Sequence, residues 1–190
     1  GNGKFNYQWQ ILQGSNWVDI NGAIGTTYQP TALQTTTQYR LKTTSQFGCG
    51  FTYSDPVTIT VYAKLQAGII TGNQNICYNT AANLLTFSTE PAGGGNSYTY
   101  QWLQSNDNAT YTEISGVTNN TYQTPNLTSN RYYKAVVISK LGCSADTTNS
   151  VFVNVYQPLV AGKITIGGLK TDTICYNTAP KQLSISQQPS

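Results

Sequence analysis

The tripeptide Tyr100-Gln101-Trp102 decides the fold, because it places two large aromatic side chains on either side of one polar side chain. Such alternation is typical of a β-strand that buries one face, so we expect Tyr100 and Trp102 to face a core and Gln101 to face away from it. The same tripeptide stands upstream as Tyr7-Gln8-Trp9. Two copies of one strand pattern indicate that the chain is built from repeats.

The repeat extends over most of the chain at a spacing of 94 positions. The matching pairs are Trp17 and Tyr111, Tyr39 and Tyr133, Cys49 and Cys143, Val57 and Val151, and Leu65 and Leu159. The motif around Cys77 returns 98 positions later around Cys175, because residues 167–170 are inserted. We therefore expect a first repeat (residues 1–64) that lacks its opening strands, a complete second repeat (residues 65–158), and the opening strands of a third repeat (residues 159–190).

The first and third repeats are complementary, since each lacks the part that the other holds. Residues 1–64 without their opening strands would leave a sheet edge and half a core exposed. One interpretation is that the chain is a segment of a longer array of such repeats. The other is that the end of one molecule completes the start of the next by strand addition.

The composition favours an all-β protein. Charged residues make up 9% of the chain, against roughly 25% in ordinary globular proteins, so Thr, Asn, Ser and Gln supply most of the polar surface. Short alternating runs at regular spacing predict, in each repeat, a sandwich of two β-sheets with no helices. The net charge of +3 comes from scattered Lys and Arg residues, so we expect no nucleic-acid partner. The apolar runs are short, and we expect no membrane insertion.

The sequence argues against an enzyme. It contains no histidine, and its seven Asp and Glu residues form no close pair in the sequence. General acid–base catalysis needs such groups held together beside a substrate. The run Gly93-Gly94-Gly95 reads as a turn rather than a phosphate-binding loop, because neither a helix nor a Lys follows it. We expect no catalytic residue, no cofactor and no metal ligand.

The four cysteines, at positions 49, 77, 143 and 175, lie far apart in the sequence. Structural zinc sites usually contain closely spaced cysteine pairs. Disulfides in an oxidising, extracellular compartment are therefore the favoured interpretation.

The aromatic residues fall into two groups. The residues expected in the core are Trp9, Trp102, Tyr39 and Tyr133. Trp17 and Tyr111 lie on a neighbouring edge hairpin, where half-exposed rings among polar residues are candidate contacts for a glycan, by stacking and hydrogen bonding. The alternative is that both rings cap the sandwich.

These motifs carry a family resemblance. A tryptophan in a central strand, a tyrosine at the start of a late long strand and a hairpin before the last strand resemble an immunoglobulin-like module. More narrowly, Ile76-Cys77-Tyr78-Asn79, Tyr100-Gln101-Trp102 and Leu141-Gly142-Cys143 resemble the repeats of giant Bacteroidetes cell-surface proteins, including flavobacterial gliding adhesins of the SprB type. The resemblance implies a secreted, extracellular protein at the cell surface, exported by type IX secretion.

The resemblance also implies a function and partners. The expected role is a structural or adhesive tandem repeat of a long surface filament or stalk, serving cell adhesion and gliding motility. The alternative is a polysaccharide-binding β-sandwich module of a secreted protein. Expected partners are neighbouring repeats of the same chain, and surface polysaccharide or other cell-surface proteins.

Particular residues take roles from the same resemblance. It implies a tyrosine corner at Tyr133 and a disulfide between Cys77 and Cys143, because an immunoglobulin-like module brings its last hairpin to the end where the chain enters. Cys49 and Cys175 would then pair outside residues 1–190. The triplets that begin at Asp146 and Asp172 resemble the short O-glycosylation signal of exported Bacteroidetes proteins, which makes Thr147 and Thr173 candidate sites; chance occurrence of so short a pattern is the alternative.

Overall fold

The computed structural model describes residues 4–188 of the 190-residue chain. The described residues form β-strands joined by turns and contain no helix; accordingly, none of them belongs to a long apolar helix able to span a membrane. The strands are β1 (Phe5–Gln13), β2 (Asn16–Asp19), β3 (Thr37–Ser45), β4 (Phe51–Tyr53), β5 (Val57–Ile59), β6 (Ile69–Ile70), β7 (Gln74–Cys77), β8 (Phe87–Thr89), β9 (Tyr98–Ser105), β10 (Thr112–Glu113), β11 (Arg131–Ser139), β12 (Ala145–Thr147), β13 (Val151–Tyr156), β14 (Lys163–Ile166) and β15 (Leu183–Gln187).

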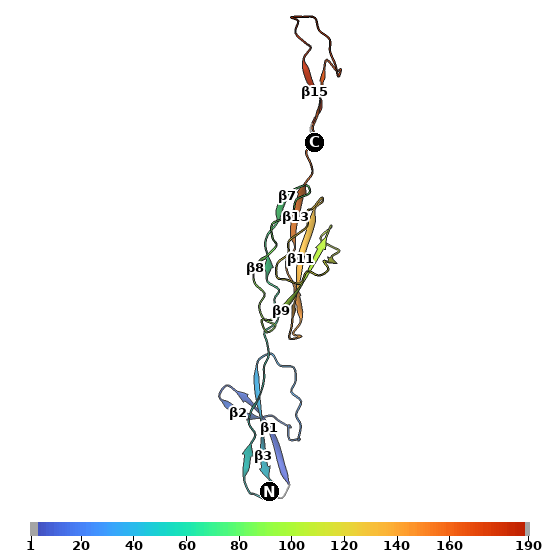
Figure 1. Cartoon of the computed structure of the whole chain (residues 1–190). Coiled ribbons are helices and arrows are strands. Elements are labelled where there is room, and N and C mark those ends of the chain that lie inside the picture. Colours follow the sequence, from blue (N-terminus) through green and yellow to red (C-terminus); the bar gives the residue numbers. More distant parts are fainter. Residues whose placement is uncertain (1–3, 189–190) are drawn as a thin grey trace. The chain divides into compact units, whose positions relative to one another are not determined.

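The larger sheet of the second repeat has the strand order β10-β9-β11-β13-β7, with β12 also paired to β11 (Figure 1). Strand β11 alternates buried and partly exposed residues along most of its length, as a strand with one core face must. Strands β11 and β13 run antiparallel, whereas β7 joins the far side of β13 in parallel. The parallel pairing of β7 determines where Cys77 lies.

The second sheet is smaller and packs over the first. It contains the antiparallel pair β6 and β8, extended by bridges from Leu85 to Tyr122 and from Thr80 to Leu127. The buried cluster between the sheets comprises Ile70, Ala82, Leu85, Trp102, Tyr122, Leu127, Tyr133, Ala135, Val151, Val153 and Val155. The second repeat is therefore a two-layer, immunoglobulin-like β-sandwich.

An aromatic stack lies at the centre of this core. The ring centroids of Trp102 and Tyr122 are 5.7 Å apart, and those of Tyr122 and Tyr133 are 5.6 Å apart. Trp102 Nε1 donates a hydrogen bond of 2.9 Å to the carbonyl oxygen of Asn119. The buried indole thus has its polar group satisfied, as a tryptophan in a core requires.

The tyrosine corner expected at Tyr133 is not formed. The side chain is fully buried, and its hydroxyl has no hydrogen-bond partner among the described residues. Burial, and then the neighbouring Tyr122, raise the pKa of Tyr133. The hydroxyl is therefore buried without the backbone hydrogen bond that a tyrosine corner would give it.

The first repeat has one sheet of the same kind, with the order β2-β1-β3-β4 and β5 also paired to β3. Its aromatic stack is equivalent, with centroid distances of 6.1 Å from Trp9 to Tyr28 and 6.0 Å from Tyr28 to Tyr39. Tyr39 is buried but Trp9 is only partly buried, so the expectation of a core tryptophan at position 9 is met incompletely. Residues 4–61 contain no counterpart of β6, β7 and β8. Trp9 is only partly buried because this second layer, which covers Trp102 in the second repeat, is missing.

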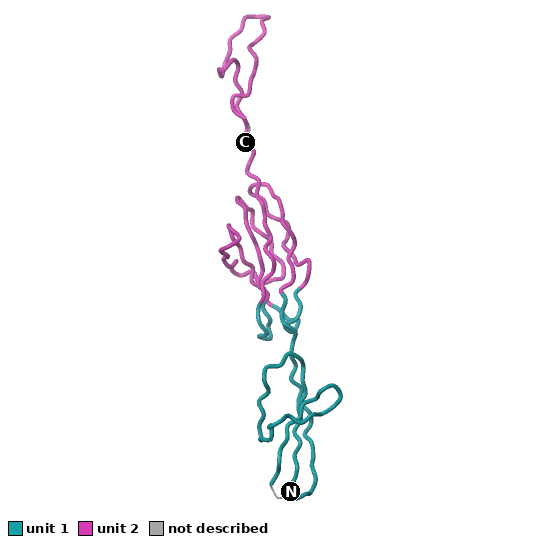
Figure 2. Tube along the Cα trace, turned by 180° about the vertical axis from the view of Figure 1, so that it is seen from behind, with its two compact units in different colours: residues 1–66, 91–98, 138–145 teal, residues 67–90, 99–137, 146–190 magenta. Residues whose placement is uncertain are grey.

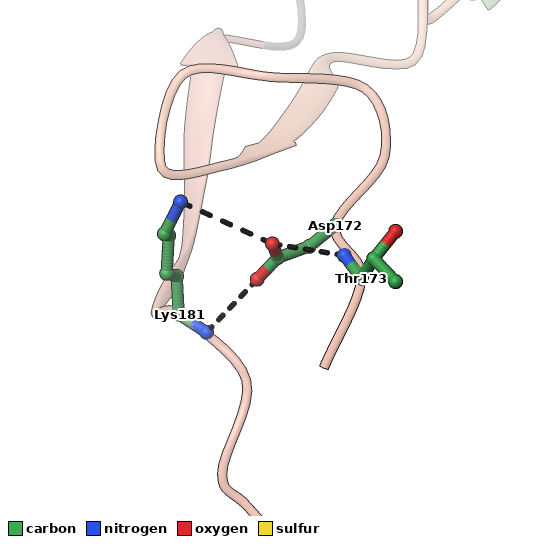
Figure 3. Close-up of polar contacts among 3 residues, drawn as sticks. All are labelled: Asp172, Thr173 and Lys181. Atoms are coloured by element: carbon green, nitrogen blue, oxygen red, sulfur yellow. Dashed lines mark hydrogen bonds and ion pairs between the residues drawn. The ribbon is translucent and has the colours of Figure 1, made fainter. Parts of the chain in front are cut away.

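The third repeat forms a hairpin of β14 and β15 with the same pairing as β6 and β8. Lys163 pairs with Gln187 and Ile164 with Ile185, the repeat equivalents of the Ile69–Thr89 and Ile70–Phe87 pairs. In the segment that joins β14 to β15, Asp172 Oδ2 accepts a hydrogen bond of 3.4 Å from the Lys181 amide, and Lys181 Nζ lies 3.9 Å from Asp172 Oδ1 (Figure 3). In the second repeat the equivalent Gln74 Oε1 accepts a bond of 2.7 Å from the Asn83 amide.

The chain divides into two compact units, coloured separately in Figure 2. The first unit contains residues 1–66, 91–98 and 138–145, and the second contains residues 67–90, 99–137 and 146–190. Two loops of the second repeat thus belong to the same unit as the first repeat. The boundaries expected from the sequence, after residues 64 and 158, stay predictions.

Equivalent valines test the consequence of the missing layer. Val151 is fully buried, whereas its counterpart Val57 is 64% exposed. Removing two buried methyl groups from Val151 forfeits transfer energy and leaves a cavity, so Val151→Ala lowers the free energy of unfolding of the second repeat by about 2 kcal/mol. Val57→Ala lowers that of the first repeat by less than about 0.5 kcal/mol. Amide hydrogen exchange of β11 and β3 measures the two losses separately, and equal losses would contradict the packing described.

Candidate functional site

A cation covers an aromatic ring on the outer face of the first repeat. Trp17 is on β2 and Arg40 on the central strand β3; the Arg40 guanidinium carbon is 4.4 Å from the Trp17 ring centroid and 3.8 Å from that of Tyr53. Gln10 fixes this arginine, since its Oε1 accepts a bond of 2.7 Å from Arg40 Nε. Its Nε2 donates a bond of 2.6 Å to Asp19. The cation is therefore held between two rings by a buried amide.

The second repeat has the same arrangement at the same positions. Lys134 Nζ lies 3.7 Å from the ring centroid of Tyr111. The Tyr111 hydroxyl is 2.5 Å from Asn108 Oδ1 and 2.8 Å from Ser150 Oγ. Each such cation–π contact contributes about 0.5–1 kcal/mol at an exposed site.

Trp17 and Tyr111 are both partly buried, which limits what they can bind. One face of each ring is covered by a cation from the next strand but one in the same sheet. A sugar could stack only on the remaining exposed part of the ring, while the cation beside it favours an anionic group. The sequence interpretation named the rings but missed Arg40 and Lys134. The repeat held the signal, because these two cations are themselves 94 positions apart and each follows a core tyrosine.

The disulfide expected between Cys77 and Cys143 is not formed: Cys49, Cys77, Cys143 and Cys175 are all free thiols. Strand β11 gives the reason. Cys77 lies opposite Tyr156, beyond the Arg131 end of β11, because Arg131 pairs with Val153. Cys143 follows the other end of β11, at Ser139. A nine-residue strand spans about 27 Å, whereas bonded cysteines need Cα atoms within about 7 Å.

The candidate O-glycosylation residues Thr147 and Thr173 are both exposed. In each triplet the preceding aspartate accepts a hydrogen bond from the threonine amide, 2.9 Å at Asp146 and 3.0 Å at Asp172. Asp146 also accepts a bond of 2.9 Å from the Ala67 amide through its other oxygen. The aspartates thus order the local backbone, and modification of the threonines stays a prediction.

Among the described residues, no three His, Cys, Asp or Glu side chains cluster closely enough to hold a metal ion. The carboxylate with a clearly shifted pKa, Asp107, lies in the turn after β9. It accepts hydrogen bonds from the amides of Ala109 and Thr110, each 2.9 Å, and from the Ser105 hydroxyl at 2.7 Å. The Ala109 amide, then Ser105 and Thr110, hold the pKa of Asp107 at about 2. These contacts stabilise a turn.

The repeated sheet, the repeated aromatic stack and the recurring hairpin pairing define a tandem immunoglobulin-like β-sandwich protein. The chain belongs to the family described as Domain of unknown function (DUF8696), which matches residues 1–63 and again residues 66–157. The two matches follow the first and second repeats.

Solved structures give weaker similarities. The fibronectin(III)-like modules of CbhA from Clostridium thermocellum are 12% identical with a TM-score of 0.36, over 79% of this chain and 78% of that chain. Immunoglobulin domains 1–4 of Sidekick-1 are 12% identical with a TM-score of 0.37, over 84% of this chain and 43% of that chain. No curated protein matches the sequence.

Asp107 makes the turn sensitive to acid. Its pKa of about 2 in the folded chain lies below the value of about 3.9 expected for an unfolded chain. The stabilisation from the ionised carboxylate is therefore complete above pH about 4 and is lost as the pH falls from about 4 to 2. A carboxyl titration followed by NMR should give a midpoint near 2, and the Ala109 and Thr110 amide signals should shift with it. Asp107→Asn is the control that removes this titration, and a midpoint near 4 would contradict the turn geometry.

Proposed function

We propose that this chain is a segment of a long extracellular stalk or filament, in which tandem β-sandwich repeats serve a structural and adhesive role at the cell surface. The observation that carries the proposal is the linker, residues 63–66, which leads out of the first repeat. It is hydrogen-bonded rather than free, and a bonded linker transmits force better than a flexible one.

The linker contacts lie within the first compact unit. The Gly94 amide donates a bond of 2.7 Å to the Ala63 carbonyl oxygen, and Gln66 and Ala92 exchange two backbone bonds of 2.9 and 3.0 Å. Leu65 is buried, with 1% of its surface exposed. Ala92 and Gly94 of one loop thus bond Gln66 and Ala63, the two ends of the linker.

Gly93 allows this close approach. Its φ is +77°, and a Cβ added there would lie 2.2 Å from the Lys64 carbonyl oxygen. No other residue fits between the loop and the linker without moving one of them. The glycine run is a turn, as the sequence indicated, and its position against the linker gives that turn a function.

Location and chemistry complete the proposal. A surface of Thr, Asn, Ser and Gln with 9% charged residues, together with recurring cysteines, supports an extracellular location. We propose a role in adhesion or gliding motility, with no enzymatic activity, no cofactor, no nucleic-acid partner and no membrane insertion. O-glycosylation of Thr147 and Thr173 would fit the same location.

A second candidate function is binding of polysaccharide on the outer face. The observation in its favour is that Trp17 beside Arg40 and Tyr111 beside Lys134 repeat the same pairing of a partly exposed ring and a cation. A ring that stacks on a sugar next to a cation suits an acidic polysaccharide.

The linker prediction uses two glycines that share a backbone conformation. Gly93→Ala forces the Lys64 carbonyl away and opens the linker, so trypsin should cleave after Lys64 about tenfold faster or more, since cleavage follows the open population. Gly142→Ala is the matched control: Gly142 has φ +73°, but a Cβ there meets nothing within 4 Å. It should leave cleavage after Lys64 unchanged. A wild-type chain that is cut there as fast as an unfolded peptide would rule out an ordered linker.

The polysaccharide prediction compares ring and cation. If the outer face binds, an insoluble acidic polysaccharide retains the chain, and Trp17→Ala combined with Tyr111→Ala reduces retention at least tenfold. Arg40→Gln combined with Lys134→Gln keeps the rings and should reduce retention of acidic but not neutral polysaccharide. If retention is unchanged after both rings are removed, the rings do not bind polysaccharide, and the stalk is the one proposed role that stands.

A further inference from the structure

The two kinds of cysteine in each repeat lie at places that recur with the same local structure. The Thr80 hydroxyl donates to the Cys77 carbonyl oxygen at 2.6 Å, and the equivalent Thr178 hydroxyl donates to Cys175 at 2.7 Å. In the hairpin, the Cys143 thiol lies 3.9 Å from the carbonyl oxygen of Leu141, and the Cys49 thiol lies 3.8 Å from that of Phe47. Cys77 and Cys175 are called opening-strand cysteines below, and Cys49 and Cys143 are called hairpin cysteines.

The opening-strand cysteine lies beside the end of the last strand of its own repeat, where the chain passes on to the next repeat. Cys77 is in parallel register with Tyr156, the last residue of β13. The Tyr78 amide then donates a bond of 2.9 Å to the Tyr156 carbonyl oxygen. Cys77 is exposed, so its thiol is available to a partner that approaches the end of β13.

The hairpin cysteine lies where the preceding repeat ends. Tyr62 is the counterpart of Tyr156 in the first repeat. Within the first compact unit, a Cβ added to Gly95 would lie 2.3 Å from Leu141 Cδ1 and 3.6 Å from Tyr62 Cδ1. Leu141 is in the turn that contains Cys143, and the Lys140 amide binds the neighbouring loop through the Ser97 carbonyl oxygen at 2.9 Å. Tyr62 therefore lies beside the turn of Cys143.

Both kinds of cysteine are expected beside the same residue, Tyr62. In the repeat that ends at Tyr62, the opening-strand cysteine would stand opposite Tyr62, as Cys77 stands opposite Tyr156. The hairpin of the following repeat approaches that same tyrosine. We propose that each opening-strand cysteine forms a disulfide with the hairpin cysteine of the next repeat, so that a covalent bond spans every junction. This inference rests on the proposed function, since it requires a longer array.

The proposal accounts for the four free thiols. The partner of Cys77 is the hairpin cysteine of the third repeat, and the partner of Cys143 is the opening-strand cysteine of the first repeat. Neither partner is among residues 1–190, and the same holds for Cys49 and Cys175. The 190 residues thus contain two cysteines of each kind but no pair that the rule would join.

The chemistry requires an oxidant. Two thiols lose two protons and two electrons as the S–S bond forms, and a thiol–disulfide oxidoreductase that carries a reactive disulfide accepts them and is released as a dithiol. Such oxidants act in the oxidising compartments outside the cytoplasm, where structural disulfides form.

Tryptic peptides of the native protein distinguish the pairings. Surface proteins of intact cells are labelled with a membrane-impermeant biotin reagent, free thiols are alkylated, and the recovered chain is digested without reduction. Cys77 falls in peptide 65–131 and Cys143 in peptide 141–163. We expect peptide 141–163 to be linked to the opening-strand peptide of the preceding repeat, and peptide 65–131 to the hairpin peptide of the following repeat.

A variant of the native chain gives the control. Cys143→Ser should make the opening-strand cysteine of the preceding repeat fully alkylatable while the bond of Cys77 stays intact. A link between peptides 65–131 and 141–163, release of Cys77 by Cys143→Ser, or complete alkylation of all cysteines in a surface-labelled array would overturn the disulfide proposal and leave the stalk role standing. Absence of surface labelling would instead overturn the stalk role, and the inference with it.

Discussion

The structure depends on how one indole N–H is satisfied inside an apolar core. Trp102 donates to the Asn119 carbonyl oxygen, and this bond positions the segment that leads to Tyr122. Tyr122 then fills the space between Trp102 and Tyr133 and bridges to Leu85 in the opposite sheet. Both sheets are thus tied to one side chain. The first repeat makes the same bond from Trp9 to Gly25, although it lacks the covering layer.

Much of this fold could be predicted from the sequence, because the strands that carry the core alternate visibly. The spacing of Tyr100 and Trp102, and of Val151, Val153 and Val155, specifies which face is buried before any tertiary contact is known. The state of the Tyr133 hydroxyl could not be predicted in this way. Whether a buried hydroxyl returns to the backbone depends on packing with Tyr122, which comes from another part of the sandwich.

The positions of the cysteines show a second limit. Nothing in the four residues of β7 specifies that they run parallel to β13 and bring Cys77 to the end of that strand, since strand pairing is non-local. The candidate glycan contacts were predicted as rings, but the cations above them come from the next strand but one in the sheet. In both cases the sequence identified a residue of interest but did not show which residue lies beside it in the fold. The repeat itself contained the missing neighbour at a fixed offset, as the match of Arg40 with Lys134 shows.

The bonded linker also limits how such a chain can change in length. Two residues separate Tyr62 from the buried Leu65 that opens the second repeat, and two residues separate the equivalent Tyr156 from Leu159. The insertion of residues 167–170 falls instead in the turn that follows β14, outside the paired residues of β14 and β15. Insertions and deletions should therefore collect in hairpin turns, while the linker keeps its length. In longer sequences of this kind, a linker of constant length should set the frame of the repeats, and turns of differing length should tell one repeat from another.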